Sequence, residues 1–184
     1  MDSAFIHQAA NELVQNVGTR NIKQIARSCS LDISETSRIR DMLGLLSLYF
    51  DKPLILINHQ LDKQTKQMVC GYALGHYLEH QLLMDLHTLD KFLTIKDKHI
   101  LLYEHNAFTS HLMLDSDEVY QMTKRGLDAA QISAAKRIHL NLVLVKLLEL
   151  HHLGYDLRHY HAQHHAFIKQ FNLPAHFQFD VATD

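Results

Sequence analysis

The chain has 184 residues, 47% of them hydrophobic and 21% charged, with a formal net charge of −2. This composition is typical of one globular domain with a sizeable core, and the near-neutral charge gives no electrostatic reason to expect nucleic acid as the main partner. The two cysteines, Cys29 and Cys70, do not suggest a disulfide framework and fit a reduced compartment.

The first fifteen residues carry an acid and a histidine among apolar residues and lack a basic segment, so they do not resemble a signal peptide. No apolar run approaches the ~18 residues needed to cross a membrane. These features predict a cytoplasmic protein without a membrane partner.

The first half of the chain predicts two helices followed by a hairpin. Apolar residues recur at helical spacing over residues 3–17, with Gly18 as a stop, and again over residues 20–30. A polar break, "SLDISETSR", comes next. The two runs "LGLLSLYF" and "LILIN", separated by "DKP", are rich in β-forming residues and predict paired strands.

The second half is predicted to be helical. A helix of about 20 residues is expected from near Asp62. A loop or partly ordered crossing over "HTLDKFLTIKDKH" and a helix over residues 100–113 are expected to follow. Ser116 is a candidate N-cap with acids after it. A long apolar helix then runs from residue 130 to Gly154. The fold class is therefore α+β: one mostly helical domain, residues 1–184, with a small β-sheet.

Histidine is unusually frequent, with 16 residues, and a His-rich C-terminal helix is predicted over residues 151–173. We interpret most of these histidines as residues of solvated faces. An alternative is that this segment senses pH or binds metal, in a homo-oligomeric structural or sensory protein.

The stretch "VCGYALGHYLEH", residues 69–80, resembles a zinc-protease helix with two residues replaced. In an H-E-x-x-H helix, two histidines four residues apart bind one Zn²⁺ and the glutamate acts on its bound water. Aligned on Gly75 and His76, this chain has Tyr72 in place of the first histidine and Ala73 in place of the glutamate. By spacing alone, His76 would be a structural histidine.

The surrounding blocks resemble the ImmA/IrrE (DUF955) family of metallopeptidases. Leu54–Asn58 match that family's strand, "LGH" at residues 74–76 matches its helix, and "EHNAFTSHLML" from Glu104 matches its second block. The resemblance covers about residues 5–150. It implies a zincin-like fold, with His76 as a metal ligand and Glu104 as the third ligand.

The departures at Tyr72 and Ala73 predict a catalytically degenerate pseudopeptidase. A phenol with a pKa near ~10 is a poor zinc ligand, and Ala73 cannot accept a proton from water. A displaced Zn²⁺ site around His76, His80 and Glu104, with His105 or His111 as further candidates, would instead allow an active peptidase.

The family resemblance also implies a regulatory role in phages, mobile elements or stress responses. Members of the family act on helix-turn-helix repressors, so the predicted partner is such a repressor or another protein. Residues 22–43 themselves have some features of a helix-turn-helix, but the turn lacks its glycine and the chain is not basic. Direct DNA binding is therefore not expected.

Overall fold

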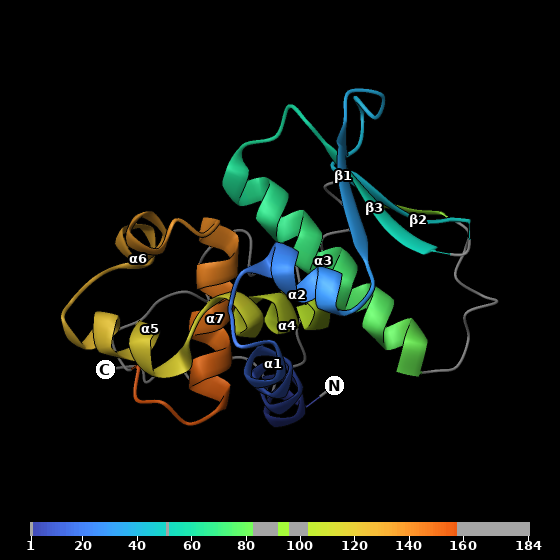
Figure 1. The fold of residues 1–184 in the computed structure, drawn as a ribbon. Helices are drawn as coiled ribbons and strands as arrows, with labels where there is room; N and C mark the ends of the chain where they lie inside the picture. Colours follow the sequence, from blue (N-terminus) through green and yellow to red (C-terminus); the bar gives the residue numbers. More distant parts are fainter. Residues whose placement is uncertain (1, 51, 83–91, 96–102, 158–184) are drawn as a thin grey trace.

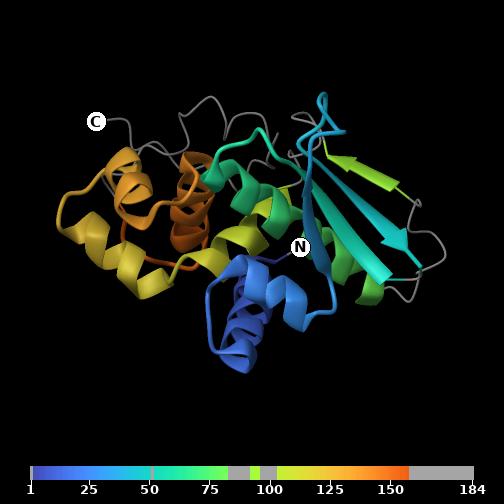
Figure 2. The ribbon, with the colours of Figure 1, turned by 45° about the horizontal axis from the view of Figure 1, so that its top comes forward.

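The computed structural model describes residues 2–50, 52–82, 92–95 and 103–157, and within these ranges it contains seven helices and four strands (Figure 1). The sheet lies on one side of the long helix α3 (Lys63–Leu82), and the other helices lie on its remaining sides (Figures 1 and 2). The predicted class, a mostly helical α+β fold with a small sheet, is confirmed.

The two predicted N-terminal helices are present, and side chains cap both. In α1 (Ser3–Val17), the Asp2 carboxylate accepts a hydrogen bond from the N–H of Ala4. The helix ends at Gly18, whose φ of +74° is the left-handed conformation that glycine adopts without strain. Asn21 caps α2 (Ile22–Ser28) in the same way as Asp2 caps α1.

The predicted polar break is wrong, because part of it forms strand β1 (Asp32–Thr36). β1 pairs in parallel with β3 (Lys52–Asn58), Asp32 lying opposite Leu54. An edge strand can be mostly polar when its partner supplies the hydrogen bonds. This strand also takes the place of the second helix that a helix-turn-helix would need.

The predicted hairpin is confirmed. Strand β2 (Gly44–Tyr49) pairs antiparallel with β3, and Gly44 lies opposite Ile57. A further strand, β4 (Phe92–Ile95), pairs with β2 in a segment that the sequence predicted to be a loop. The sheet order is β1-β3-β2-β4.

Asn58, the last residue of the strand motif "LILIN", is buried and organises the loop beside the sheet. Its Nδ2 donates to the carbonyls of Ile39 (3.1 Å) and Met42 (3.0 Å), while its Oδ1 accepts from the N–H of Gln60 (3.0 Å). A single amide thereby holds the chain entering β2 next to the chain leaving β3.

Helix α3 is the centre of the molecule. It begins next to Asp62, as predicted, and the Asp62 carboxylate caps it by accepting from the N–H groups of Gln64 and Thr65. Residues 68–75 are buried on every side of the helix, as expected for a helix covered by a sheet and by other helices. Helix α4 (Tyr103–Met113) crosses α3 at Gly71, where a Cβ atom would lie 2.2 Å from the γ-methyl of Thr109.

The C-terminal part differs from the sequence prediction at two places. Asp115, not Ser116, is the N-cap of α5 (Ser116–Lys124). The predicted long apolar helix is two helices, α6 (Ala129–Lys136) and α7 (Leu140–His152).

The break between α6 and α7 has a local cause. Arg137 has a φ of +53°, and the N–H of Ile138 returns to the Ser133 carbonyl (3.2 Å), which ends α6. The side chain of His139 then caps α7 by accepting from the N–H of Asn141. No glycine marks this stop, so the apolar pattern alone did not indicate it.

One hydrophobic core joins α1 to α7, and residues from Ile6 to Leu157 take part in it. The predicted His-rich helix over residues 151–173 begins inside α7, and its residues from 158 onward lie outside the described ranges. Among the helices that are described, none is both long and apolar enough to cross a lipid bilayer.

The crossing at Gly71 generates a stability prediction. We expect Gly71→Ala to lower the free energy of unfolding by about 1–3 kcal/mol, because overpacking against the buried Thr109 exceeds the helix-propensity gain of ~1 kcal/mol. Urea denaturation followed by circular dichroism measures the change.

Thr109→Ser is the matched second substitution, since it removes the γ-methyl and keeps the hydroxyl that donates to the His105 carbonyl. The double variant should recover part of the loss. Equal stability of Gly71→Ala and wild type would show that the helices have room to separate.

Candidate functional site

The two degenerate motif positions are both part of the core. Tyr72 is 1% exposed and Ala73 is fully buried. The ring of Tyr72 packs edge-on against the imidazole of His105 on α4, with 5.2 Å between ring centroids. Burial, with a smaller contribution from the charge of Glu79, raises the pKa of Tyr72 to about 12. The phenol is therefore protonated at neutral pH.

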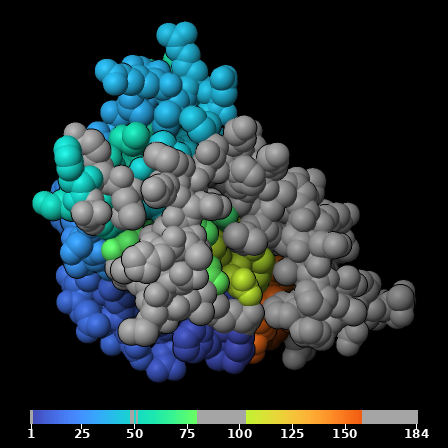
Figure 3. All heavy atoms as spheres, turned by 90° about the vertical axis from the view of Figure 1, so that its right-hand side faces the viewer, coloured from blue at the N-terminus to red at the C-terminus, as the bar shows by residue number. Residues whose placement is uncertain are grey.

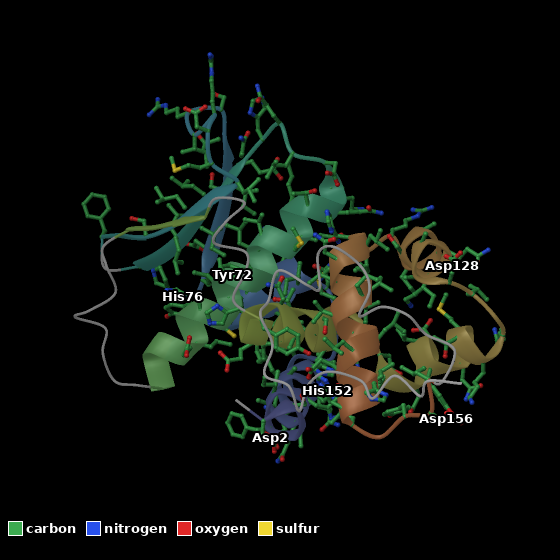
Figure 4. All side chains as sticks on the ribbon, turned by 180° about the vertical axis from the view of Figure 1, so that it is seen from behind. Asp2, Tyr72, His76, Asp128, His152 and Asp156 are labelled. Atoms are coloured by element: carbon green, nitrogen blue, oxygen red, sulfur yellow. The ribbon has the colours of Figure 1, made fainter. Side chains whose placement is uncertain are left out.

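His76 lies one turn further along α3 and also faces His105. The two rings are 5.3 Å apart and nearly perpendicular, at 88°. Figure 4 shows Tyr72 and His76 on the stretch of α3 that passes α4. Glu79, three residues after His76 on the same helix, places its Oε2 2.8 Å from Nε2 of His105.

His76, Glu79 and His105 form a group of potential metal ligands. One ligand atom from each lies within 4.8 Å of the others, and no second group of this kind occurs among the described residues. His105 is buried, whereas His76 and Glu79 are partly exposed. The group therefore lies at the edge of the α3–α4 contact, with one side open to solvent.

The ligands predicted from the sequence are only partly brought together. His76 is in the group, but Glu104, in the first turn of α4, is not; its neighbour His105 is. His80 belongs to the last turns of α3, and its side chain lies outside the described part of the structure. The metal assignments to His80 and Glu104 thus remain predictions.

Cys70 shares α3 with His76 but does not form a nucleophile–base pair with it. It is fully buried, and burial raises the pKa of its thiol to about 12. A buried thiol of this kind has a packing role in the core and is not a reactive nucleophile.

A second cluster of titratable groups is buried between α4 and α7. Nε2 of His111 contacts Glu149 (3.1 Å), and Nδ1 of the same ring contacts Nζ of Lys146 (2.7 Å). Lys146 also donates to Ser116 Oγ (2.9 Å). Glu149 additionally accepts from the hydroxyls of Ser3 and Tyr103. We call these residues the buried polar network.

The contacts define the proton positions in this network. Burial alone would raise the pKa of Glu149, but hydrogen bonds from His111, His152 and Tyr103 lower it below its usual range. Its carboxylate is therefore ionised and accepts from Nε2–H of His111, whose Nδ1 is then free to accept from Lys146. Burial lowers the pKa of His111 to about 4 and also lowers that of Lys146.

Comparison with known families identifies the scaffold. The family described as the IrrE N-terminal-like domain matches residues 31–148, which include all four strands, α3 and α4. The chain belongs to this ImmA/IrrE peptidase family. The match begins after α2, whereas the sequence resemblance extended to about residue 5. No curated protein matches the chain.

Two positions that the resemblance assigns to the family's catalytic motif hold other side chains here. Residue 72 is a phenol whose pKa is raised to about 12, and residue 73 is an alanine, which has no proton acceptor. The donors that do converge are His76, Glu79 and His105, two imidazoles and a carboxylate, a combination that zinc accepts.

Sequence reasoning missed two features of this region. Glu79 was not predicted as a ligand, although its H-x-x-E spacing from His76 puts both on one helix face. The buried polar network was also missed. Its signal was present in "LVLVKLLEL", where Lys146 and Glu149 interrupt an otherwise apolar run at a spacing of three.

The buried polar network generates a pH prediction. His111 is neutral when folded, with a pKa of about 4, and has a pKa near ~6.5 when unfolded, so unfolding binds a proton between these values. Its contribution to stability, about 3 kcal/mol, should be complete above pH ~6.5 and lost as the pH falls toward 4. Urea unfolding from pH 4 to 7 measures it.

The control is His111→Gln, whose amide can serve Glu149 and Lys146 without titrating. His7, on α1, and His152, on α7, also face the network and are present in both proteins. The free energy of unfolding of the wild type, measured relative to that of the variant, should increase as the pH rises through this window. Parallel curves would contradict the prediction.

Proposed function

We propose that this ImmA/IrrE-family domain is a pseudopeptidase with a regulatory role, which binds or antagonises a helix-turn-helix repressor or another protein partner without cleaving it. The observation that carries the proposal is the burial of Tyr72 and Ala73 at the positions of the first zinc ligand and the catalytic glutamate.

Two chemical losses support the non-catalytic part. Catalytic zinc sites hold the ion with three protein ligands and leave a position for water. Here the first ligand position holds a phenol with a pKa of about 12. General-base catalysis contributes typically ~10²–10⁴-fold to rate, and a methyl group at residue 73 cannot supply it.

Retention of the scaffold supports the binding part. The family match covers residues 31–148, and within it the core around α3 is well packed, with the Asn58 hydrogen bonds, the close approach at Gly71 and the buried face of α4. A domain that keeps the family fold without the family's catalytic residues can still use the surface around the α3 motif to bind a partner. The choice of a repressor as partner follows from the family resemblance alone.

A second candidate function is an active zinc peptidase with a displaced metal site around His76, His80 and Glu104. The observation that favours it is the convergence of metal-ligating side chains next to His76. It requires a proton acceptor other than residue 73. The carboxylate of the group, that of Glu79, already contacts the imidazole of His105 at 2.8 Å.

The binding proposal predicts a complex. When the purified protein is mixed, in the presence of EDTA, with the helix-turn-helix repressor encoded nearest to its gene, we expect the two to co-elute in gel filtration. We also expect the repressor's affinity for its operator to fall, measured by fluorescence anisotropy. The repressor should remain intact on a denaturing gel.

Two charge reversals test which face binds. Glu79→Arg, beside His76, should weaken the complex tenfold or more. Asp41→Arg, in the exposed loop before β2, should not. No complex and no change in operator binding would contradict the proposal.

A further inference from the structure

The three side chains at the α3–α4 contact come together because two helices approach closely. His76 and Glu79 are three residues apart on α3 and so lie on one face. On α4, His105 reaches that face because Gly75 has no side chain: a Cβ there would lie 3.6 Å from His105 Cδ2 and 3.3 Å from Phe108. In Figure 3, which views the molecule from the right-hand side of Figure 1, atoms of α3 and α4 lie next to each other at the surface.

We infer that His76, Glu79 and His105 bind a divalent transition-metal ion, of which Zn²⁺ is the best match, and that the ion links α3 to α4. Two imidazole nitrogens and one carboxylate oxygen are a ligand set that suits zinc, and imidazole ligands also suit Cu²⁺ and Ni²⁺. The inference does not depend on the proposed partner.

The position of the ligand atoms supports this inference. They already lie within 4.8 Å of one another, in contact across the two helices, so a small adjustment brings them around one ion. The Glu79 side chain is 39% exposed, which leaves a path from solvent for an ion. A carboxylate ligand offsets part of the charge of a divalent ion.

A second observation concerns the state of His105. The residue is only 6% exposed, yet its Nδ1 has no hydrogen-bond partner among the described residues. Its other nitrogen contacts Glu79, a member of the same group. The ring is thus held in place by the group itself.

This site differs from the zinc site that the family resemblance implies. Only His76 belongs to both. Tyr72 and Glu104, at the other family positions, are not members of the group. The expected effect of the ion is therefore on the packing of α4 against α3.

Titration of the chelator-treated protein with ZnCl₂ tests the inference. Isothermal titration calorimetry should give one strong site per chain, and the unfolding temperature should rise by several degrees when zinc is added. Glu79→Gln is the main variant, because the side chain is partly exposed and the substitution keeps its shape, so the fold should not be affected. It should weaken zinc binding at least tenfold and reduce the temperature shift, as should His76→Ala and His105→Ala.

Three control variants locate the ion. Tyr72→Phe and Glu104→Gln change the family positions, and His59→Ala removes an exposed histidine outside the group. All three should keep the affinity of the wild type. Circular dichroism of each metal-free variant verifies that it is folded.

Three results would overturn the inference. One is the absence of strong zinc binding by the wild-type protein. Another is binding unchanged in Glu79→Gln and His105→Ala, which would place the ion elsewhere. The third is loss of binding in Tyr72→Phe or Glu104→Gln with His105→Ala unaffected, which would place it at the family positions.

Discussion

The close approach of α3 and α4 is the constraint on which the rest of this structure depends. Gly71 lies against the γ-methyl of Thr109, and Gly75 lies against Phe108 and His105. With the helices this close, the core closes around α3, and side chains from α4 meet those of the segment that resembles the peptidase motif. The glycine of the "LGH" sequence thus has a packing role.

Two polar layers flank this contact, and they differ in exposure. On one side, His76, Glu79 and His105 meet at the edge of the core, where solvent or an ion can reach them. On the other, Lys146 and Glu149 are fully buried and connected through His111. A buried ion pair needs such satisfying contacts to offset its desolvation. The buried layer fixes α7 against α4 through His111, Lys146 and Glu149, whereas the exposed layer lies at the edge of the α3–α4 contact.

Much of the fold could be predicted because its signals are local. The hairpin follows from two β-forming runs, the end of α1 from a glycine, and the start of α3 from the change to a helical pattern near Asp62. β1 could not be predicted in this way, because a polar edge strand is defined by its pairing with β3. The break between α6 and α7 was missed because Arg137 adopts a left-handed conformation without a glycine.

At the site, the sequence indicated His76 and the replacements at Tyr72 and Ala73. The contact between Glu79 and His105 depends on how two helices cross, which spacing along one helix does not show.

The central claim is that the peptidase scaffold persists here without its hydrolytic chemistry. Its most direct test is incubation of the zinc-saturated protein with the candidate repressor and with unfolded casein, with products identified by mass spectrometry. We expect no cleavage above the level of a His76→Ala sample prepared in parallel. Peptide products that accumulate over many turnovers with the wild type and disappear with His76→Ala would contradict the account.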